Sequence, residues 1–230
     1  MTLAPLAGPR LPPLRGEAAQ LVVLLHGYGA DGEDLIGLAP MLRKALPGAA
    51  FAAPNAPQRC AGAPMGRQWF AISRLDAEEA RRGVESASGA LENFLDSELS
   101  RLGLPAERLA LVGFSQGAMM ALHAGLRRSA KPAVVIGFSG MLAGQPPALG
   151  ADAPPILLIH GAADPMIPVQ ALFDAAGRLG AAGAAVQWRV SPGLGHSIDE
   201  TGLTLAAMHL SMAFRGLLRR RQPEICCALR

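Results

Sequence analysis

One pentapeptide in the sequence has the pattern of an activated serine nucleophile. Residues 113–117 read Gly-Phe-Ser-Gln-Gly, a G-x-S-x-G motif centred on Ser115. In a nucleophile elbow the serine sits in a strained turn between a strand and a helix, and its neighbours are small because the two elements pass close together. The motif alone is weak, but a buried-strand pattern precedes it and a long apolar helical pattern follows it. We therefore predict that Ser115 is a nucleophile.

A serine hydroxyl reacts only when a base takes its proton, and a carboxylate best holds that base in place. In one known arrangement the chain order is serine, carboxylate, histidine, and each residue follows a strand. Asp164 fits, because it lies just past a buried strand in a loop where Pro165 discourages a helix. The other downstream aspartates do not follow a strand in this way: Asp152, Asp174 and Asp199. The competing interpretation of Asp164 is a turn or helix-capping residue.

The base is predicted to be His196, which lies in a glycine-flanked loop after the last expected strand. His209 also follows Asp164, but it falls in the middle of a predicted helix, where a partly buried packing role is expected. A loop histidine without a role is the competing interpretation of His196. The remaining histidines precede Asp164 and are in the wrong order: His26, His123 and His160. His26 and His160 end predicted strands and are expected to be structural hydrogen-bonding residues.

The negative oxygen that forms during attack on a carbonyl needs two backbone N–H donors, one on the residue after the nucleophile and one on an earlier loop. Gln116 supplies the first, and Tyr28 in the loop His26-Gly-Tyr-Gly29 is predicted to supply the second. Phosphate binding by this loop is disfavoured, because the sequence has neither a G-x-x-x-x-G-K-[ST] nor a G-x-G-x-x-G motif. No His, Cys and carboxylate spacing indicates a metal site, and no cofactor is expected.

These residues must be positioned by alternating strands and helices. Apolar runs predict strands, and 3.6-residue periodicity predicts helices. Strands are expected at 20–25, 49–53, 132–138, 155–159 and 185–190, and the elbow strand and helix within 108–127. Further helices are expected at 33–45, about 77–102, 169–182 and 199–218, the second of them bent or broken at Gly83 or Gly89. The alternation predicts an α/β fold with a parallel sheet covered on both faces, whose ligands bind at the carboxyl ends of the strands.

The chain is expected to form a single catalytic domain over residues 19–218. Residues 1–18 are predicted to be an arm or an edge strand, residues 54–75 an irregular loop, and residues 219–230 an exposed tail. Half of the 230 residues are hydrophobic, which is ample for a core.

Composition also excludes several classes of function. The net charge is only +3 and aromatic residues make up 4% of the chain, so a nucleic-acid partner is not expected. The three cysteines do not form a disulfide framework, which favours a reducing compartment. Neither a signal peptide nor a membrane-spanning run is visible, so a cytoplasmic location is predicted.

With these residues in place, the chain resembles the phospholipase/carboxylesterase family of α/β hydrolases, which includes the acyl-protein thioesterases. The resemblance covers about residues 20–215 and rests on six motifs in order: 25–32, 53–57, Trp69-Phe70, 113–117, 160–168 and Gly195-His196. It implies an α/β-hydrolase fold without a large lid domain, a Ser115/Asp164/His196 triad, and hydrolysis of acyl esters or thioesters without a cofactor. It also implies an acyl groove lined by Tyr28, Met65, Trp69, Phe70, Leu142, Ile167 and Leu194, with ordinary core packing as the alternative for each.

Two departures from the thioesterases favour a bacterial-type carboxylesterase acting on short- to medium-chain esters. Thioesterase members commonly have leucine where this chain has Tyr28, and residues 59–67 also differ from theirs. The alternatives left open are an acyl-protein thioesterase or lysophospholipase and, from another class, a catalytically silent binding module. A cysteine hydrolase based on Cys60 is disfavoured because no base is placed for it. Some relatives form dimers over the active-site mouth, and the sequence leaves a homodimer open.

Overall fold

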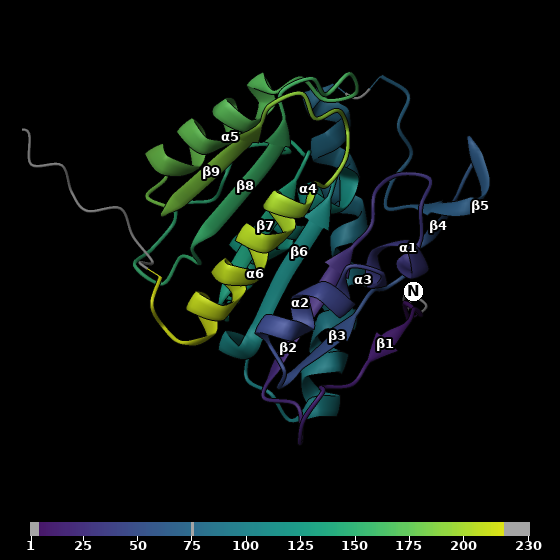
Figure 1. The fold of residues 1–230 in the computed structure, drawn as a ribbon. Helices are drawn as coiled ribbons and strands as arrows, with labels where there is room; N and C mark the ends of the chain where they lie inside the picture. Colours follow the sequence, from purple (N-terminus) through teal and green to yellow (C-terminus); the bar gives the residue numbers. More distant parts are fainter. Residues whose placement is uncertain (1–4, 75, 219–230) are drawn as a thin grey trace, which may run out of the picture.

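The computed structural model describes residues 5–74 and 76–218, built around a seven-stranded sheet (Figure 1). Its order is β1-β3-β2-β6-β7-β8-β9, and every pair is parallel except β1 with β3. The strands are β1 (Arg10–Leu11), β2 (Gln20–Leu25), β3 (Ala49–Ala52), β6 (Leu109–Phe114), β7 (Val134–Phe138), β8 (Ile156–Gly161) and β9 (Val186–Ser191). The predicted mostly parallel sheet is therefore confirmed. The predicted tail at 219–230 lies outside the described residues.

The central strands are apolar throughout because both faces of the sheet are covered. Successive side chains on a strand point to opposite faces. Leu21, Val23 and Leu25 of β2 belong to one core cluster, whereas Val22 and Leu24 belong to the other. The continuous apolar sequence of β2 therefore contributes side chains to the hydrophobic cores on both faces of the sheet.

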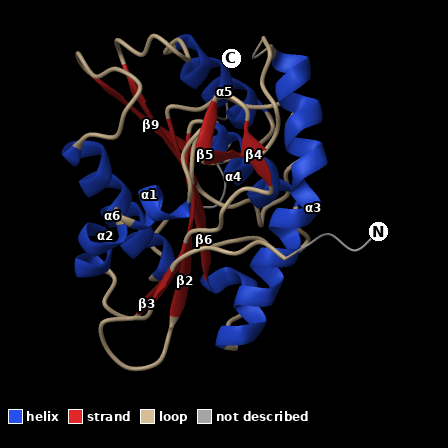
Figure 2. Ribbon diagram, turned by 90° about the vertical axis from the view of Figure 1, so that its right-hand side faces the viewer, coloured by secondary structure: helices blue, strands red, loops and turns tan. Residues whose placement is uncertain are grey.

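Helices cover each face of the sheet, as the alternation of elements predicts. They are α1 (Gly32–Ile36), α2 (Ala39–Ala45), α3 (Ala77–Leu102), α4 (Gln116–Arg127), α5 (Gln170–Ala181) and α6 (Glu200–Phe214). Figure 2 shows α1, α2 and α6 on one side of the strands and α3 and α4 on the other. Helix α5 contributes to the same core as α3 and α4. Within the described residues, no lid domain covers the carboxyl ends of the strands.

The helix predicted at 33–45 is instead two short helices. Helix α1 ends at Ile36, with Gly37 as its C-cap, and α2 begins at Ala39 with Pro40 in its first turn. Proline is favoured at the start of a helix, because its missing N–H would have no partner there. The last helix also ends earlier than predicted, at Phe214, shortly before Gly216 adopts a positive φ of 70°.

The segment predicted to be irregular contains an antiparallel hairpin of β4 (Gln58–Cys60) and β5 (Ala63–Gln68). Figure 1 shows this hairpin standing away from the main sheet. Two backbone hydrogen bonds join it to the loop after β2: Gly29 N–H donates to Arg67 O, and Arg67 N–H donates to Ala30 O. Two loops that follow neighbouring strands are thereby fixed to each other.

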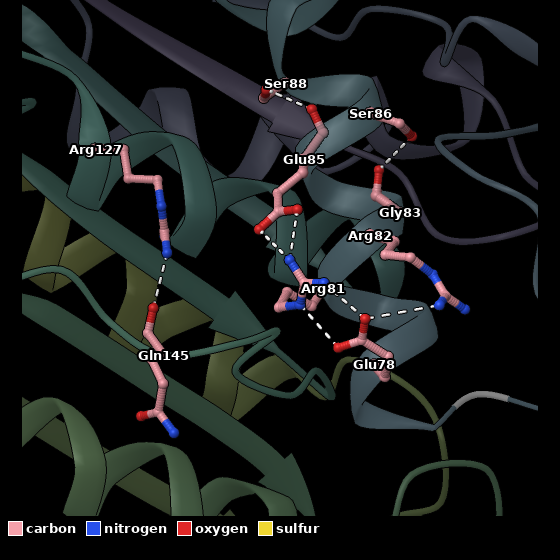
Figure 3. A network of polar contacts seen from close by, with 9 residues as sticks. All are labelled: Glu78, Arg81, Arg82, Gly83, Glu85, Ser86, Ser88, Arg127 and Gln145. Atoms are coloured by element: carbon pink, nitrogen blue, oxygen red, sulfur yellow. Dashed lines mark hydrogen bonds and ion pairs between the residues drawn. The ribbon is translucent and has the colours of Figure 1, made fainter.

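Helix α3 runs without interruption from Ala77 to Leu102, so the expected break at Gly83 or Gly89 is wrong. Gly83 has a packing role, because a Cβ there would lie 2.2 Å from the Phe70 ring. On the outer surface, Arg81 binds Glu78 and Glu85 one turn to either side (Figure 3). Pairs at this spacing stabilise a helix only weakly when they are exposed, but they favour the helical conformation around the two glycines.

Among the helices of residues 5–74 and 76–218, none combines the length and the apolar character needed to cross a bilayer.

Gly83→Ala is expected to lower the free energy of unfolding by roughly 1–3 kcal/mol, because the new methyl group overlaps the Phe70 ring. The matched control is Gly177→Ala in α5, where a Cβ meets nothing within 4 Å. That change should raise stability by roughly 0.5–1 kcal/mol, the usual gain from alanine in a helix. Urea denaturation of both variants makes the comparison, and equal stabilisation of the two would contradict the packing role of Gly83.

Candidate active site

Ser115 lies between β6 and α4 in a backbone conformation that is unfavourable for a residue with a side chain. Its φ is 55° and its ψ is −118°. Positive φ costs about 1–3 kcal/mol for such a residue and persists only where the surroundings impose it. Here the backbones pass too close for side chains, since a Cβ on Gly113 would lie 2.2 Å from Gly117 O and one on Gly117 would lie 1.9 Å from Leu25 O. The two glycines of the motif are therefore required by the turn itself.

The structure brings Ser115, His196 and Asp164 into one hydrogen-bonded chain. His196 Nε2 lies 3.0 Å from Ser115 Oγ, and His196 Nδ1 lies 2.7 Å from Asp164 Oδ2. A carboxylate only accepts hydrogen bonds, so Nδ1 carries the imidazole proton and Nε2 has a lone pair for the serine hydroxyl. This arrangement makes the serine proton transferable to His196.

The Asp164 carboxylate is buried and held by the backbone of its own turn. Its Oδ1 accepts from Met166 N–H at 2.8 Å and from Ile167 N–H at 3.0 Å. Burial acts to raise the pKa of Asp164, but hydrogen bonds from Ile167, His196 and Met166 outweigh it and the pKa is lowered. The carboxylate therefore stays ionised and fixed in orientation.

His160 holds the same turn from the end of β8. Its Nε2 lies 2.8 Å from Ile167 O and 3.2 Å from Asp164 Oδ2. The sequence predicts a structural hydrogen-bonding role for this residue, and the structure places its ring against the Asp164 carboxylate. Chain order alone indicates only that His160 precedes Asp164, so this contact could not be derived from the sequence.

One predicted oxyanion donor, Tyr28, lies in the loop after β2, and the other, Gln116, directly follows Ser115. Among the described residues, neither Tyr28 N–H nor Gln116 N–H has a hydrogen-bond acceptor. Gln116 is the first residue of α4, where backbone N–H groups have no partner within the helix and favour negative charge. These properties suit donors to a developing oxyanion.

A groove with both apolar and polar lining residues opens beside His196. Its volume is about 310 Å³, and it is lined by Asp34, Leu35, Leu38, Phe114, His196, Ser197 and Ile198. The Phe114 ring packs against the His196 ring with 4.9 Å between centroids. The sequence did not predict this groove. Leu35 and Leu38 fit the core-facing stripe of a predicted helix, and Phe114 occupies a variable position of the G-x-S-x-G motif.

Six further residues are predicted to line an acyl groove, and that role stays a prediction. Four are buried in the core: Trp69, Phe70, Leu142 and Ile167. Met65 is 92% exposed on β5, and Leu194 is partly buried in the loop before His196. None of the six lines the groove beside His196.

Other candidate residues do not join the site. His209 is buried in α6, which fits the packing role expected for it. In the described part of the chain, no three His, Cys, Asp or Glu side chains are grouped so that they could hold a metal ion.

Comparison with known proteins agrees with this geometry. The sequence profile of the phospholipase/carboxylesterase family matches residues 10–214. The chain belongs to this family. It is accordingly a carboxylic ester hydrolase with the α/β-hydrolase fold.

Individual relatives include esterases and thioesterases. Esterase YpfH of Escherichia coli is 32% identical over 197 residues, which cover 84% of this chain and 82% of that protein. Acyl-protein thioesterase 1 of Gibberella zeae is 28% identical over 204 residues, covering 80% and 86%. Among solved structures, esterase PE8 aligns with a TM-score of 0.84 and 39% identity, over 94% of this chain and all of that one.

Replacement of Asp164 by asparagine is expected to make the free energy of unfolding depend less on pH in the acid range. The folded protein lowers the pKa of Asp164 below its unfolded value of about 3.9, so the carboxylate stabilises the fold above that pH. This stabilisation is lost as the pH falls through the folded pKa. The free energy of unfolding in urea should therefore drop less in Asp164→Asn than in the wild type between about pH 5 and about pH 2. An equal drop in both proteins would show that the carboxylate is not held as described.

Proposed function

We propose that this chain is a serine carboxylesterase that hydrolyses short- to medium-chain acyl esters through an acyl-enzyme on Ser115. The observation that carries the proposal is the continuous hydrogen-bonded chain from Ser115 Oγ through the imidazole of His196 to the Asp164 carboxylate. The three residues lie 81 and 32 positions apart along the chain, so their meeting depends on the fold. All come from one chain, and neither a nucleic acid nor a second copy is needed to complete the site.

The first half-reaction transfers the acyl group to the serine. Ser115 Oγ bonds to the ester carbonyl carbon while its proton moves to His196 Nε2. The carbonyl oxygen becomes an oxyanion, which the N–H groups of Tyr28 and Gln116 bind. The bond to the leaving alcohol then breaks, and His196 returns the proton to that alcohol.

In the second half-reaction, water attacks the acyl-enzyme with His196 again as the base. Collapse of the second tetrahedral intermediate releases the acid and restores the Ser115 hydroxyl. Asp164 stays ionised throughout and stabilises the imidazolium that forms in each half-reaction. No metal or cofactor takes part in the proposed sequence of steps.

The groove beside His196 is proposed to hold the acyl chain, because Leu35, Leu38, Phe114 and Ile198 give it apolar walls. We also propose a reducing, cytoplasmic location, because an odd number of cysteines, two of them adjacent, does not suit a disulfide framework.

Thioester hydrolysis is the second candidate, favoured by the acyl-protein thioesterases among the relatives. Rates on p-nitrophenyl esters and on acyl thioesters of matched chain length separate the two activities. A carboxylesterase should act at least as fast on the esters, whereas a strong preference for long-chain thioesters would favour the alternative.

Ser115→Ala is expected to abolish the burst of p-nitrophenol from an activated ester and to lower kcat by roughly 10⁶-fold, as loss of a triad nucleophile does elsewhere. A fluorophosphonate probe should label the wild type on the peptide that contains Ser115 and leave the variant unlabelled. Unchanged turnover in the variant would rule out Ser115 as the nucleophile.

The acyl groove gives a second prediction. Each buried CH₂ contributes about 0.8 kcal/mol, so kcat/KM should rise roughly fourfold per CH₂ until the chain outgrows the groove. Leu38→Trp narrows the groove and should move the optimum toward shorter acyl chains. The control is Met41→Trp, at an exposed position in α2, the helix that Leu38 caps, and outside the groove lining. An unchanged optimum in the Leu38 variant would place the acyl chain elsewhere.

A further inference from the structure

The oxyanion donors of the proposed reaction need a fixed direction, and a buried hydrogen-bonded chain runs between the two residues that supply them. This inference rests on the proposed function. It concerns side chains that do not touch the reacting atoms: the imidazole of His26, the indole of Trp69 and the carboxamide of Gln116.

The hydrogen bonds of His26 determine which of its nitrogens carries the proton. The residue is fully buried, with Nε2 3.0 Å from Ala56 N and Nδ1 2.7 Å from Gly27 O. A backbone N–H can only donate, so Nε2 must be the acceptor and the proton must lie on Nδ1. The Nδ1–H group then donates to Gly27 O. Burial also lowers the pKa of His26, which favours this neutral form.

The carbonyl that His26 binds belongs to the same peptide unit as Tyr28 N–H. The peptide is planar and trans, so its C=O and N–H groups point in opposite directions. Holding Gly27 O against the imidazole therefore turns Tyr28 N–H away from it. Without this bond, the Gly27–Tyr28 peptide could rotate and remove one donor from the oxyanion.

Trp69 connects this loop to the second donor residue. Its indole Nε1–H donates to His26 O at 3.1 Å, and its backbone N–H donates to the Gln116 side chain at 2.8 Å. The Gln116 amide group donates in turn to Phe70 O at 2.8 Å. Gln116 and Trp69 are both fully buried, so each of these bonds would be costly to break.

We propose that His26 and Trp69 are positioning residues for the oxyanion hole. His26 fixes the orientation of the Gly27–Tyr28 peptide through Nδ1–H, and Trp69 joins that loop to Gln116 at the start of α4. The side chain of Gln116 thereby anchors one donor loop while its backbone N–H serves as the other donor.

Two substitutions of His26 separate its two hydrogen bonds. In His26→Asn, the amide nitrogen can take the place of Nδ1 and donate to Gly27 O, but nothing accepts from Ala56 N–H. In His26→Gln, the amide oxygen can take the place of Nε2 and accept from Ala56 N–H, but the donor to Gly27 O is lost. Only the glutamine variant lacks the bond that the proposal requires.

The test compares kcat and KM for p-nitrophenyl butyrate. Loss of one oxyanion donor costs about 10²–10³ in kcat, so His26→Gln should lower kcat by about 100-fold with KM nearly unchanged. His26→Asn should keep kcat within about tenfold of the wild type. Affinity for a trifluoromethyl ketone, which forms an oxyanion on the serine, should fall in parallel with kcat. His209→Gln, at another buried histidine, is the control and should keep wild-type kcat.

Equal kcat in folded His26→Gln and wild type would overturn the proposal, as would equal losses in folded Gln and Asn variants. If the His26 variants do not fold, Trp69→Phe decides the matter, because it keeps an aromatic ring and removes only the indole donor. Its kcat should fall roughly tenfold with KM unchanged, and an unchanged kcat would overturn the proposal. Failure of the proposed function looks different: the wild type itself would then neither hydrolyse the ester nor react with a fluorophosphonate.

Discussion

The structure depends on the close approach of three backbone segments at the carboxyl end of β6. Strand β6, the start of α4 and the end of β2 pass so near one another that Gly113 and Gly117 have no room for a Cβ. This contact forces Ser115 into positive φ, and the sheet then holds it there, since Ser115 N–H donates to Phe138 O on the neighbouring strand. Ser139 repeats the arrangement one strand along, with a positive φ of 47° and its N–H bound to Ile159 O. Strain of this kind persists because hydrogen bonds of the sheet over-determine it.

The sequence predicted the triad residues because a parallel sheet converts chain order into spatial proximity. Ser115, Asp164 and His196 each follow a strand, and the carboxyl ends of parallel strands share one edge. The sequence also predicted that both faces of the sheet are covered, because strands buried on both sides are apolar along their whole length. These predictions relied on each residue lying just after a strand. They therefore hold even if the predicted end of a strand is wrong by a few residues.

Features that depend on contacts between distant segments could not be read in this way. The β4–β5 hairpin has exposed side chains and an irregular register at Arg59 and Cys60, so it lacks the alternation that marks a strand. Its hydrogen bonds to the loop after β2 help to hold it in place. Gly83 is similar, since the ring that excludes a side chain there comes from Phe70, thirteen positions earlier. The groove beside His196 also combines residues from three separate segments of the chain.

Three histidines lie near Ser115, and their hydrogen bonds separate the one suited to exchange protons from those suited to hold structure. Both nitrogens of His26 bind backbone groups, and Nε2 of His160 is bound to Ile167 O. Both rings are buried, and a further proton on His26 Nε2 would break its hydrogen bond with Ala56 N–H. His196 differs, because its side chain is 19% exposed and Nε2 faces only the Ser115 hydroxyl. Its Nδ1 faces an ionised carboxylate that stabilises the charged ring. Burial and hydrogen bonding therefore assign the proton-transfer role to the most exposed ring, and the same criterion assigns positioning roles to the other two.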